Sequence, residues 1–250
     1  MKVEWDYSER AGTYAKRPDY AEAAIDAILA RAGIQPGDSA CDIGAGSGHL
    51  TEPLLQRGLR VSAVEPNDPM AALGRARTAA YGSVQWHKGQ AEATGLASGG
   101  FNLVTFGSSF NVADRTAALA ETARLLKPGG WFACIWNHRD LDDPLQQAIE
   151  ETIHRHIPAY ELGVRREDQA LVILACGLFD QLEIIDFPVS HETDRDDWCD
   201  AWSSHATLAR QAGDKMAEVV AAIRTLVAVA VGPRLVVPYR TRGWMARLKD

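Results

Sequence analysis

The chain has few cysteines, and they form no metal or disulfide motif. They are far apart in a sequence of 250 residues, with no Cys-x-x-Cys pair: Cys41, Cys134, Cys176 and Cys199. This spacing argues against zinc-binding motifs and against a disulfide framework. We therefore expect four small packed side chains and no metal site.

Long hydrophobic runs and an excess of positive charge are also missing. No segment approaches the roughly 20 apolar residues of a membrane-spanning helix, and the first residues, MKVEWDYSERAGTYAKRP, contain no apolar signal core. The 26 Lys and Arg against 33 Asp and Glu give a formal net charge of −7, which offers no general attraction for nucleic acid or anionic lipid. We expect a cytoplasmic protein with a small-molecule substrate and no nucleic-acid or membrane partner; a homodimer is compatible with the sequence.

Short apolar segments that alternate with helical patterns are abundant. Five predicted strands are bounded by Gly, Pro, Asn or Asp: Ser39–Ile43, Arg60–Val64, Val84–Lys88, Phe101–Phe106 and Trp131–Trp136. Predicted helices lie between them at His49–Arg57, Pro69–Ala80 and Arg115–Leu126, the last ended by LKPGG. This order predicts an α/β fold with a parallel sheet and helices on both faces.

The pattern changes after residue 136. Helices are predicted at Pro144–His156 and Glu167–Cys176, and strands at Leu182–Ser190 and in the closing RLVVPYRTRGWMARL. Residues 196–231 between these strands are too long for a hairpin turn and predict a helical cap. The expected single domain has five parts: a helical lid (1–32), a ligand-binding core (33–139), the rest of the core (140–192), the cap (193–232) and a final strand (233–250).

A glycine-rich turn follows the first predicted strand. In CDIGAGSG, Gly44, Gly46 and Gly48 let backbone amides approach a ligand beside a helix N-terminus, which is typical of nucleotide-like ligands. Dinucleotide dehydrogenases carry GxGxxG, whereas His49 occupies the position of the third glycine here. The chain also has no YxxxK pair. An NAD(P)-dependent oxidoreductase is therefore a distant alternative.

Five ordered motifs carry a resemblance to a known family. They are CDIGAGSG, VEPNDPM, KGQAEATGL, FNLVTFGSSFN and LLKPGGWFACIWNHRD. Over residues 7–139 and the final strand, the chain resembles class I S-adenosylmethionine-dependent methyltransferases, in particular the bacterial ubiquinone and trans-aconitate branch. The resemblance implies a Rossmann-like, mostly parallel seven-stranded sheet with an N-terminal helical lid and a cap before the last strand. It also implies S-adenosylmethionine as cofactor and S-adenosylhomocysteine as product.

The resemblance also implies a set of cofactor-binding residues. Asp42 would receive the amino group of the methionine part, and Glu65 would accept hydrogen bonds from the ribose hydroxyls. From the residues alone, Asp42 could instead stabilise the turn, Glu65 could be an exposed loop acid, and Met70 could pack in the core. The implied residues are Tyr14, Arg17, Asp42, Gly44, Ala45, Gly46, Gly48, Leu50, Glu65, Pro66, Met70, Gln90, Ala91, Glu92, Phe106 and Gly107.

Acceptor-side residues are expected at the end of the fourth strand and in the cap. The candidates are Tyr7, Ser108, Phe110, Asn111, Trp136, Trp198 and Trp202, although the cap tryptophans could equally pack the cap. His138 and His205 are candidate bases, and holding the reactants in line could suffice without a base. Catechol-type methyltransferases that use magnesium have an Asp at the position of FGSS, which this chain lacks, so the resemblance implies metal-independent transfer. We expect methyl transfer to an O or N atom of a small metabolite, and the aromatic residues of the cap favour a planar or heteroaromatic acceptor. A non-catalytic, cofactor-binding regulatory protein is the alternative.

Overall fold

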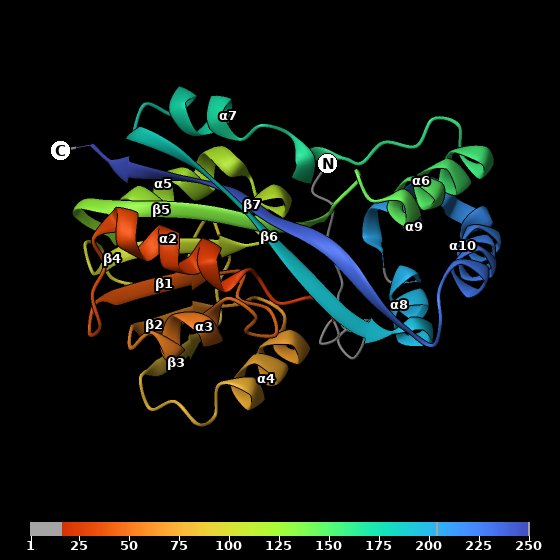
Figure 1. The fold of residues 1–250 in the computed structure, drawn as a ribbon. Coiled ribbons are helices and arrows are strands. Elements are labelled where there is room, and N and C mark those ends of the chain that lie inside the picture. Colours follow the sequence, from red (N-terminus) through yellow and green to blue (C-terminus); the bar gives the residue numbers. More distant parts are fainter. Residues whose placement is uncertain (1–16, 204, 250) are drawn as a thin grey trace.

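A computed structural model describes residues 17–203 and 205–249 and shows a seven-stranded sheet (Figure 1). The strands are β1 (Ser39–Ile43), β2 (Arg60–Val64), β3 (Val84–His87), β4 (Phe101–Gly107), β5 (Leu126–Arg139), β6 (Phe179–Asp194) and β7 (Arg234–Leu248). Their order is β3-β2-β1-β4-β5-β7-β6, and only β7 runs antiparallel to its neighbours. The expected mostly parallel sheet is confirmed.

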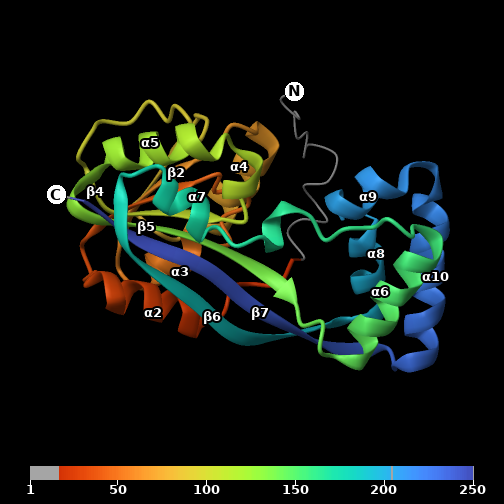
Figure 2. The same ribbon diagram turned by 90° about the horizontal axis from the view of Figure 1, so that it is seen from above.

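Helices cover both faces of this sheet (Figures 1 and 2). One face packs against α2 (Glu22–Ala32) and α3 (Thr51–Gln56), and the other against α5 (Arg115–Leu125) and α7 (Ala170–Ala175). The remaining helices are α4 (Asp68–Arg77), α6 (Pro144–His156), α8 (Arg195–Trp202), α9 (Ala206–Ala212) and α10 (Met216–Ala230), with 3-10 turns η2 (Phe110–Val112), η3 (Val164–Arg166) and η4 (Gly213–Lys215).

Side-chain caps explain where several helices begin. Asp143 accepts a hydrogen bond from the Gln146 amide, and proline occupies the first turn, so α6 begins where the sequence predicted. Asp194 accepts hydrogen bonds from two backbone amides in the same way and starts α8. The local sequence therefore fixes the starts of α6 and α8.

Several predicted boundaries differ from the structure, and two of these differences change the description of the fold. The N-terminal helix begins at Glu22, because residues 17–21 are not helical, and α2 packs on the sheet through Ile25 and Ile28. The predicted lid at residues 1–16 lies outside the described residues. Strand β5 begins at Leu126 instead of Trp131, because a register shift opposite Phe101–Leu103 absorbs the LKPGG segment within the strand.

The cap has a hydrophobic core of its own. Helices α6, α8, α9 and α10 pack around a cluster that includes Ile149, Trp198, Val219 and Ile223. Strands β6 and β7 extend past the sheet as an antiparallel ribbon to reach these helices (Figure 2). The cap therefore lies beyond the carboxyl end of β5, next to the edge where the glycine turn is found.

Candidate functional site

The glycine turn follows β1 and is held tightly against β2. Gly44, Gly46 and Gly48 have φ of 67°, 55° and 82°, a region that disfavours other residues. A Cβ on Gly44 would lie 2.5 Å from the Cβ of Ser109. The amides of Gly44 and Ala45 both donate to the Val64 carbonyl, at 2.8 and 3.0 Å. The expected bare amide edge is thus wrong at these positions, because both amides are already hydrogen-bonded within the protein.

Glu65, at the end of β2, is tied to the same turn. Its Oε2 accepts from the Gly46 amide at 2.8 Å and its Oε1 from the Asn67 amide at 2.9 Å. The residue is 8% exposed, which excludes a simple exposed loop acid, and burial raises its pKa. A carboxylate has about four acceptor positions, so capacity remains for further donors such as sugar hydroxyls.

Asp42, at the end of β1, is the most deeply buried acid of the site. Its carboxylate accepts from the Thr51 hydroxyl at 2.7 Å and from the Thr105 hydroxyl at 3.0 Å. Burial, helped by the nearby Glu65, raises the pKa of Asp42 to about 6, although the hydrogen bonds from Thr51 and Thr105 act in the opposite direction. Asp42 also lines the cavity described below. It therefore both stabilises the start of α3 and faces the space where a ligand would bind.

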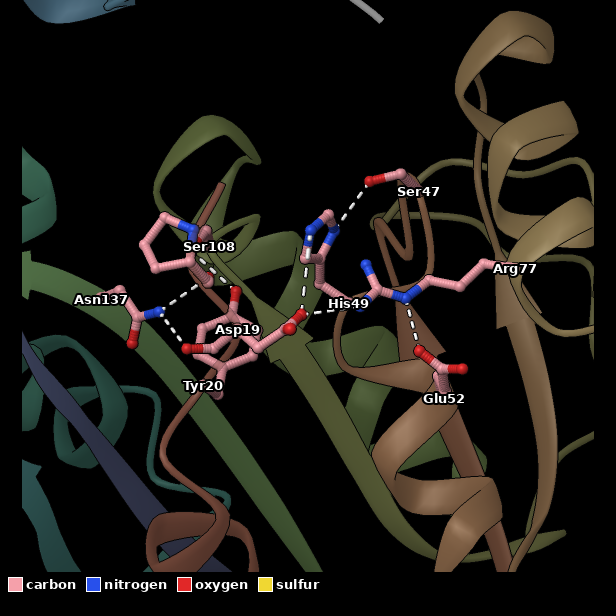
Figure 3. Close-up of polar contacts among 9 residues, drawn as sticks. Asp19, Tyr20, Ser47, His49, Glu52, Arg77, Ser108 and Asn137 are labelled. Atoms are coloured by element: carbon pink, nitrogen blue, oxygen red, sulfur yellow. Dashed lines mark hydrogen bonds and ion pairs between the residues drawn. The ribbon is translucent and has the colours of Figure 1, made fainter. Parts of the chain in front are cut away.

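Residues 18–20 cross the carboxyl ends of the central strands (Figure 3). The Asn137 side-chain amide donates to the carbonyls of Pro18 and Asp19, both at 2.9 Å. The hydroxyls of Tyr20 and Ser108 lie 2.9 Å apart, and Ser108 has a φ of 60°, which is unusual for a residue other than glycine. This segment therefore fixes one wall of the site.

Charged side chains connect that segment to the glycine turn (Figure 3). Arg77 of α4 donates to Asp19 at 2.7 Å and to Glu52 of α3 at 2.5 Å. The His49 ring is 2.8 Å from the Ser47 hydroxyl, and its Nε2 is 3.9 Å from Asp19. Burial, helped by Arg77, lowers the pKa of His49 to about 4, so this imidazole is neutral at physiological pH.

A cavity extends from the glycine turn to the cap, and it brings together twelve of the predicted site residues. Six come from the N-terminal half of the site: Arg17, Asp42, Gly44, Ala45, Gly46 and Leu50. Six come from β4, β5 and the cap: Gly107, Ser108, His138, Trp198, Trp202 and His205. The cavity therefore joins the expected cofactor residues to the expected acceptor residues.

The cap end of the cavity is aromatic and closely packed. The Trp198 and Trp202 rings meet edge to face, with centroids 5.7 Å apart. The His205 ring stacks on Trp202 at 5.3 Å, and the Arg139 guanidinium lies 4.4 Å from the centre of the same Trp202 ring. Trp202 therefore holds Arg139 and His205 in place as well as packing the cap.

The geometry assigns different roles to the two histidines. His205 caps α9, because its Nδ1 accepts a hydrogen bond from the Leu208 amide at 3.2 Å. A neutral His205 then carries its proton on Nε2 and donates, which disfavours the role of base at this residue. His138, at the end of β5, is 7% exposed and lines the cavity, so its position is compatible with the predicted role of base.

Three predicted residues lie in the core instead of the site. Phe106 and Phe110 pack edge to face with centroids 5.3 Å apart and are fully buried with Phe132. Trp136 is also fully buried, and its indole N–H donates to the Asn111 side-chain carbonyl at 2.8 Å. Asn111 therefore orients a core side chain. None of these residues is among the cavity-lining residues that the structure describes.

The remaining members of the implied cofactor-binding set are spread beside the turn. Met70 is buried, and its methyl carbon lies 3.3 Å from where a Gly46 Cβ would stand. Pro66 and Gln90 are exposed, Ala91 packs partly against the core, and Glu92 accepts from the Asp114 amide at 2.8 Å. Gly48 has a packing role, because its Cβ would lie 3.4 Å from Gly74 of α4. Tyr7 and Tyr14 lie outside the described residues.

Several cavity residues were not predicted from the sequence. Tyr20, Asn137, Arg139, Tyr160 and Arg166 all line the cavity. Asn137 and Arg139 flank the predicted His138 at the carboxyl end of a strand. Polar residues at such a strand end indicate a ligand site, so the sequence could have identified these two residues. Tyr160 and Arg166 lie in the irregular segment after α6, where the sequence offers no such pattern.

Two further findings concern metals and membranes. Among the described residues, no group of three or more His, Cys, Asp or Glu side chains is placed to hold a metal ion. Within the same residues, no helix has the length and apolar character needed to cross a membrane.

Comparisons with known proteins give a consistent result. Residues 41–134 match the methyltransferase domain family. The chain is 35% identical over 135 residues to an uncharacterised methyltransferase of Mycobacterium tuberculosis, covering 54% of this chain and 53% of the relative. It is 36% identical over 104 residues to a ubiquinone/menaquinone biosynthesis C-methyltransferase of Rubrivivax gelatinosus, covering 40% of each. The chain thus matches about half the length of these relatives or less.

Solved structures share the fold over most of the chain. A protein from Anaeromyxobacter dehalogenans, proposed to be a type II methyltransferase, superposes with a TM-score of 0.65 at 20% identity, covering 93% of this chain and 97% of the other. A phosphoethanolamine N-methyltransferase of Haemonchus contortus, solved with S-adenosylhomocysteine, gives a TM-score of 0.56 at 16% identity, covering 97% of this chain and 57% of the other.

The fold is therefore that of class I methyltransferases. Residues 41–134 match the methyltransferase domain family, and part of the chain is similar to relatives named ubiquinone/menaquinone biosynthesis C-methyltransferases, which confirms the resemblance expected from the sequence.

Proposed function

We propose that the protein transfers a methyl group from S-adenosylmethionine to an O or N atom of a small metabolite, without a metal ion. The observation that carries the proposal is the continuous cavity, which joins the glycine turn and Asp42 to an aromatic cap. Such an arrangement leaves room for a cofactor at one end and an acceptor at the other.

The residues around the turn fit the proposed cofactor. A side chain at Gly44 would collide with Ser109, and one at Gly107 would come within 3.0 Å of the Tyr20 hydroxyl, so both glycines keep the cavity open. Glu65 retains acceptor capacity for ribose hydroxyls, and the buried Asp42 suits an ammonium group. When bound, the cofactor would supply a methyl group on a positively charged sulfur.

The protein's own contribution is positioning and proton removal. The wall formed by Tyr20, Ser108 and Asn137 would hold the acceptor next to the turn, since aligning two reactants can supply roughly 7–11 kcal/mol of a barrier. A hydroxyl or ammonium acceptor must also lose a proton, and His138 is the cavity residue suited to take it.

The test is incubation of the protein with methyl-labelled S-adenosylmethionine and fractionated metabolite extracts. We expect a labelled small molecule, and nuclear magnetic resonance of the product would show whether O, N or C carries the label. Carbon is the competing outcome, because several relatives are named C-methyltransferases. Cofactor binding without any labelled product would favour the regulatory alternative, and absence of cofactor binding would exclude both.

A further inference from the structure

A buried hydroxyl outside the cavity holds the segment that crosses the strand ends. Residues 17–21, the crossing segment, contribute three residues to the cavity wall. Thr241 of β7 is fully buried and is not among the cavity-lining residues that the structure describes. Its side chain nevertheless contacts the crossing segment, because the Ala21 amide donates to the Thr241 hydroxyl at 2.7 Å. Thr241 is therefore placed to act on the cavity through this segment.

The hydrogen bonds around Thr241 run in one direction. A threonine hydroxyl has a single proton, and because the Ala21 amide donates to its oxygen, that proton goes to the Asn137 Oδ1 at 2.6 Å. Thr241 and Asn137 face each other in the antiparallel pairing of β7 with β5. The NH2 group of Asn137 then donates to the carbonyls of Pro18 and Asp19, both at 2.9 Å. Thr241 thus sets which end of the Asn137 amide meets the crossing segment.

This contact is better shielded from water than the ion pair of the same segment. Asp19 pairs with Arg77 at 2.7 Å, but the Asp19 side chain is 65% exposed, and exposed ion pairs contribute little to stability. Ala21 is the N-cap residue of α2, which has no side-chain cap of its own. Loss of the Thr241 hydroxyl would remove a buried partner from the Ala21 amide and from Asn137, which is costly in the interior.

A displaced crossing segment would move one wall of the cavity. The Tyr20 hydroxyl lies 2.9 Å from the Ser108 hydroxyl, and a Cβ on Gly107 would lie 3.0 Å from the same Tyr20 oxygen. Tyr20 is therefore packed directly on the end of β4. Asp42 and Gly44 of the glycine turn line the same cavity as Tyr20. The position of the segment should then affect how long a ligand at the turn stays bound.

From these contacts we propose that Thr241 is a positioning residue of the site. Through its bond to Ala21 and through Asn137, it holds the crossing segment in place at the cavity wall and so slows the release of a bound cofactor. This inference rests on the proposed function, which supplies the ligand. Thr241 acts through its two partners and touches neither the ligand nor the reacting atoms.

The first measurement uses the cofactor-free protein. Exchange of the Ala21 amide with deuterium, followed by nuclear magnetic resonance, should become about tenfold faster in Thr241→Val, which keeps the side-chain shape and loses the hydroxyl. Thr241→Ser retains the hydroxyl and should exchange within about twofold of the parent. Asn137→Asp cannot donate to the two carbonyls and should also exchange faster, so it provides the same test if Thr241→Val does not fold.

The second measurement is the release of labelled S-adenosylhomocysteine into an excess of the unlabelled compound. We expect release to be about tenfold faster in Thr241→Val and unchanged in Thr241→Ser. Thr152→Val is the matched control, because Thr152 of α6 is also buried. Its hydroxyl likewise donates to a carbonyl, that of Ala148, and accepts from Arg155, both at 2.8 Å. This control loses the same kind of hydroxyl in the cap and should release the ligand at the parent rate.

Equal release rates in the Thr241 and Thr152 valine variants would overturn the inference, because a general loss of stability would then explain both. Unchanged exchange of the Ala21 amide in Thr241→Val would also overturn it, and so would parent-like rates that Thr241→Ser fails to restore. The proposed function fails separately, if S-adenosylhomocysteine does not bind to the parent protein. The exchange measurement on the cofactor-free chain then still decides whether Thr241 holds the crossing segment.

Discussion

The two ends of the cavity are built in different ways. At the glycine turn, Asp42 and Glu65 stand at the ends of neighbouring parallel strands, and the sheet fixes their separation. At the cap, the lining residues belong to helices with a separate hydrophobic core, reached through Arg139 and the β6–β7 ribbon. Cofactor binding and acceptor binding should therefore respond to different substitutions.

The largest effect is expected at Arg139, where the two ends are joined. Arg139→Met leaves the largely buried Glu150 without its partner, which should lower the free energy of unfolding by about 3–5 kcal/mol in urea denaturation. The double variant Arg139→Met/Glu150→Leu should recover most of this loss, because no buried charge remains. A double variant no more stable than the single one would show that the ion pair is not the cause.

The next effect concerns the turn itself. Gly44→Ala should weaken S-adenosylhomocysteine binding by about 100-fold in calorimetry, because the new Cβ displaces Ser109 and the turn. Gly99→Ala is the matched control: its φ of 65° is nearly the same as the 67° of Gly44, but nothing lies within 4 Å of its Cβ.

The control should lose only about 1 kcal/mol of stability from backbone strain and should bind normally. If the two alanine variants bind the cofactor product equally well, the turn does not carry the cofactor site.

A smaller loss of cofactor affinity is expected when Glu65 is replaced. Glu65→Ala removes the acceptor of the Gly46 amide and of the proposed ribose bonds, and should weaken cofactor binding by about 1–3 kcal/mol. Asp38→Ala removes a carboxylate that also accepts from a backbone amide, at 2.8 Å, but precedes β1 at the opposite edge of the sheet. Unchanged affinity in the Glu65 variant, measured beside this control, would exclude the ribose assignment.

The smallest effect is a pH dependence at Asp42, whose pKa is raised to about 6 by burial. Affinity for the ammonium-bearing cofactor product should rise by up to about tenfold from pH 5 to pH 7, because the ionised fraction of a carboxyl group with this pKa rises from roughly one tenth to nine tenths. His49 stays neutral over this range, because its pKa is lowered to about 4.

Stability of the cofactor-free protein should show the opposite slope. The folded state holds the Asp42 proton more tightly than the unfolded state, so this contribution is present at low pH and is lost as pH rises through about 6. Asp42→Asn should flatten both curves, measured by calorimetry and by urea denaturation. Parallel curves in the variant and the parent would show that another group titrates.

The sheet end of the site could be predicted largely from sequence, because short apolar runs bounded by turn residues locate β1, β2 and β7 at their observed bounds. Phe106 and Trp136 were predicted as site residues but are buried in the core, and this difference has a physical reason. Strands buried on both faces are apolar throughout, so alternation does not show which side chains face a cavity.

The cap end was less predictable. The spacing of Trp198 and Trp202 indicated a shared helix face, and both residues line the cavity. The role of His205 depends on a helix that begins directly after it, and the place of Arg166 depends on the carbonyl of Arg139, a residue far away in sequence. Such contacts are set by tertiary packing, which local patterns do not encode.

The last residue pair of the β6–β7 ribbon is Asp194 with Arg234. The chain therefore leaves the ribbon and returns to it at neighbouring points. The helices between these residues resemble an inserted module, and a short hairpin loop could join the same two positions without altering the register. Exchanging this module between related proteins would change the cap end of the cavity while the glycine turn is kept unchanged.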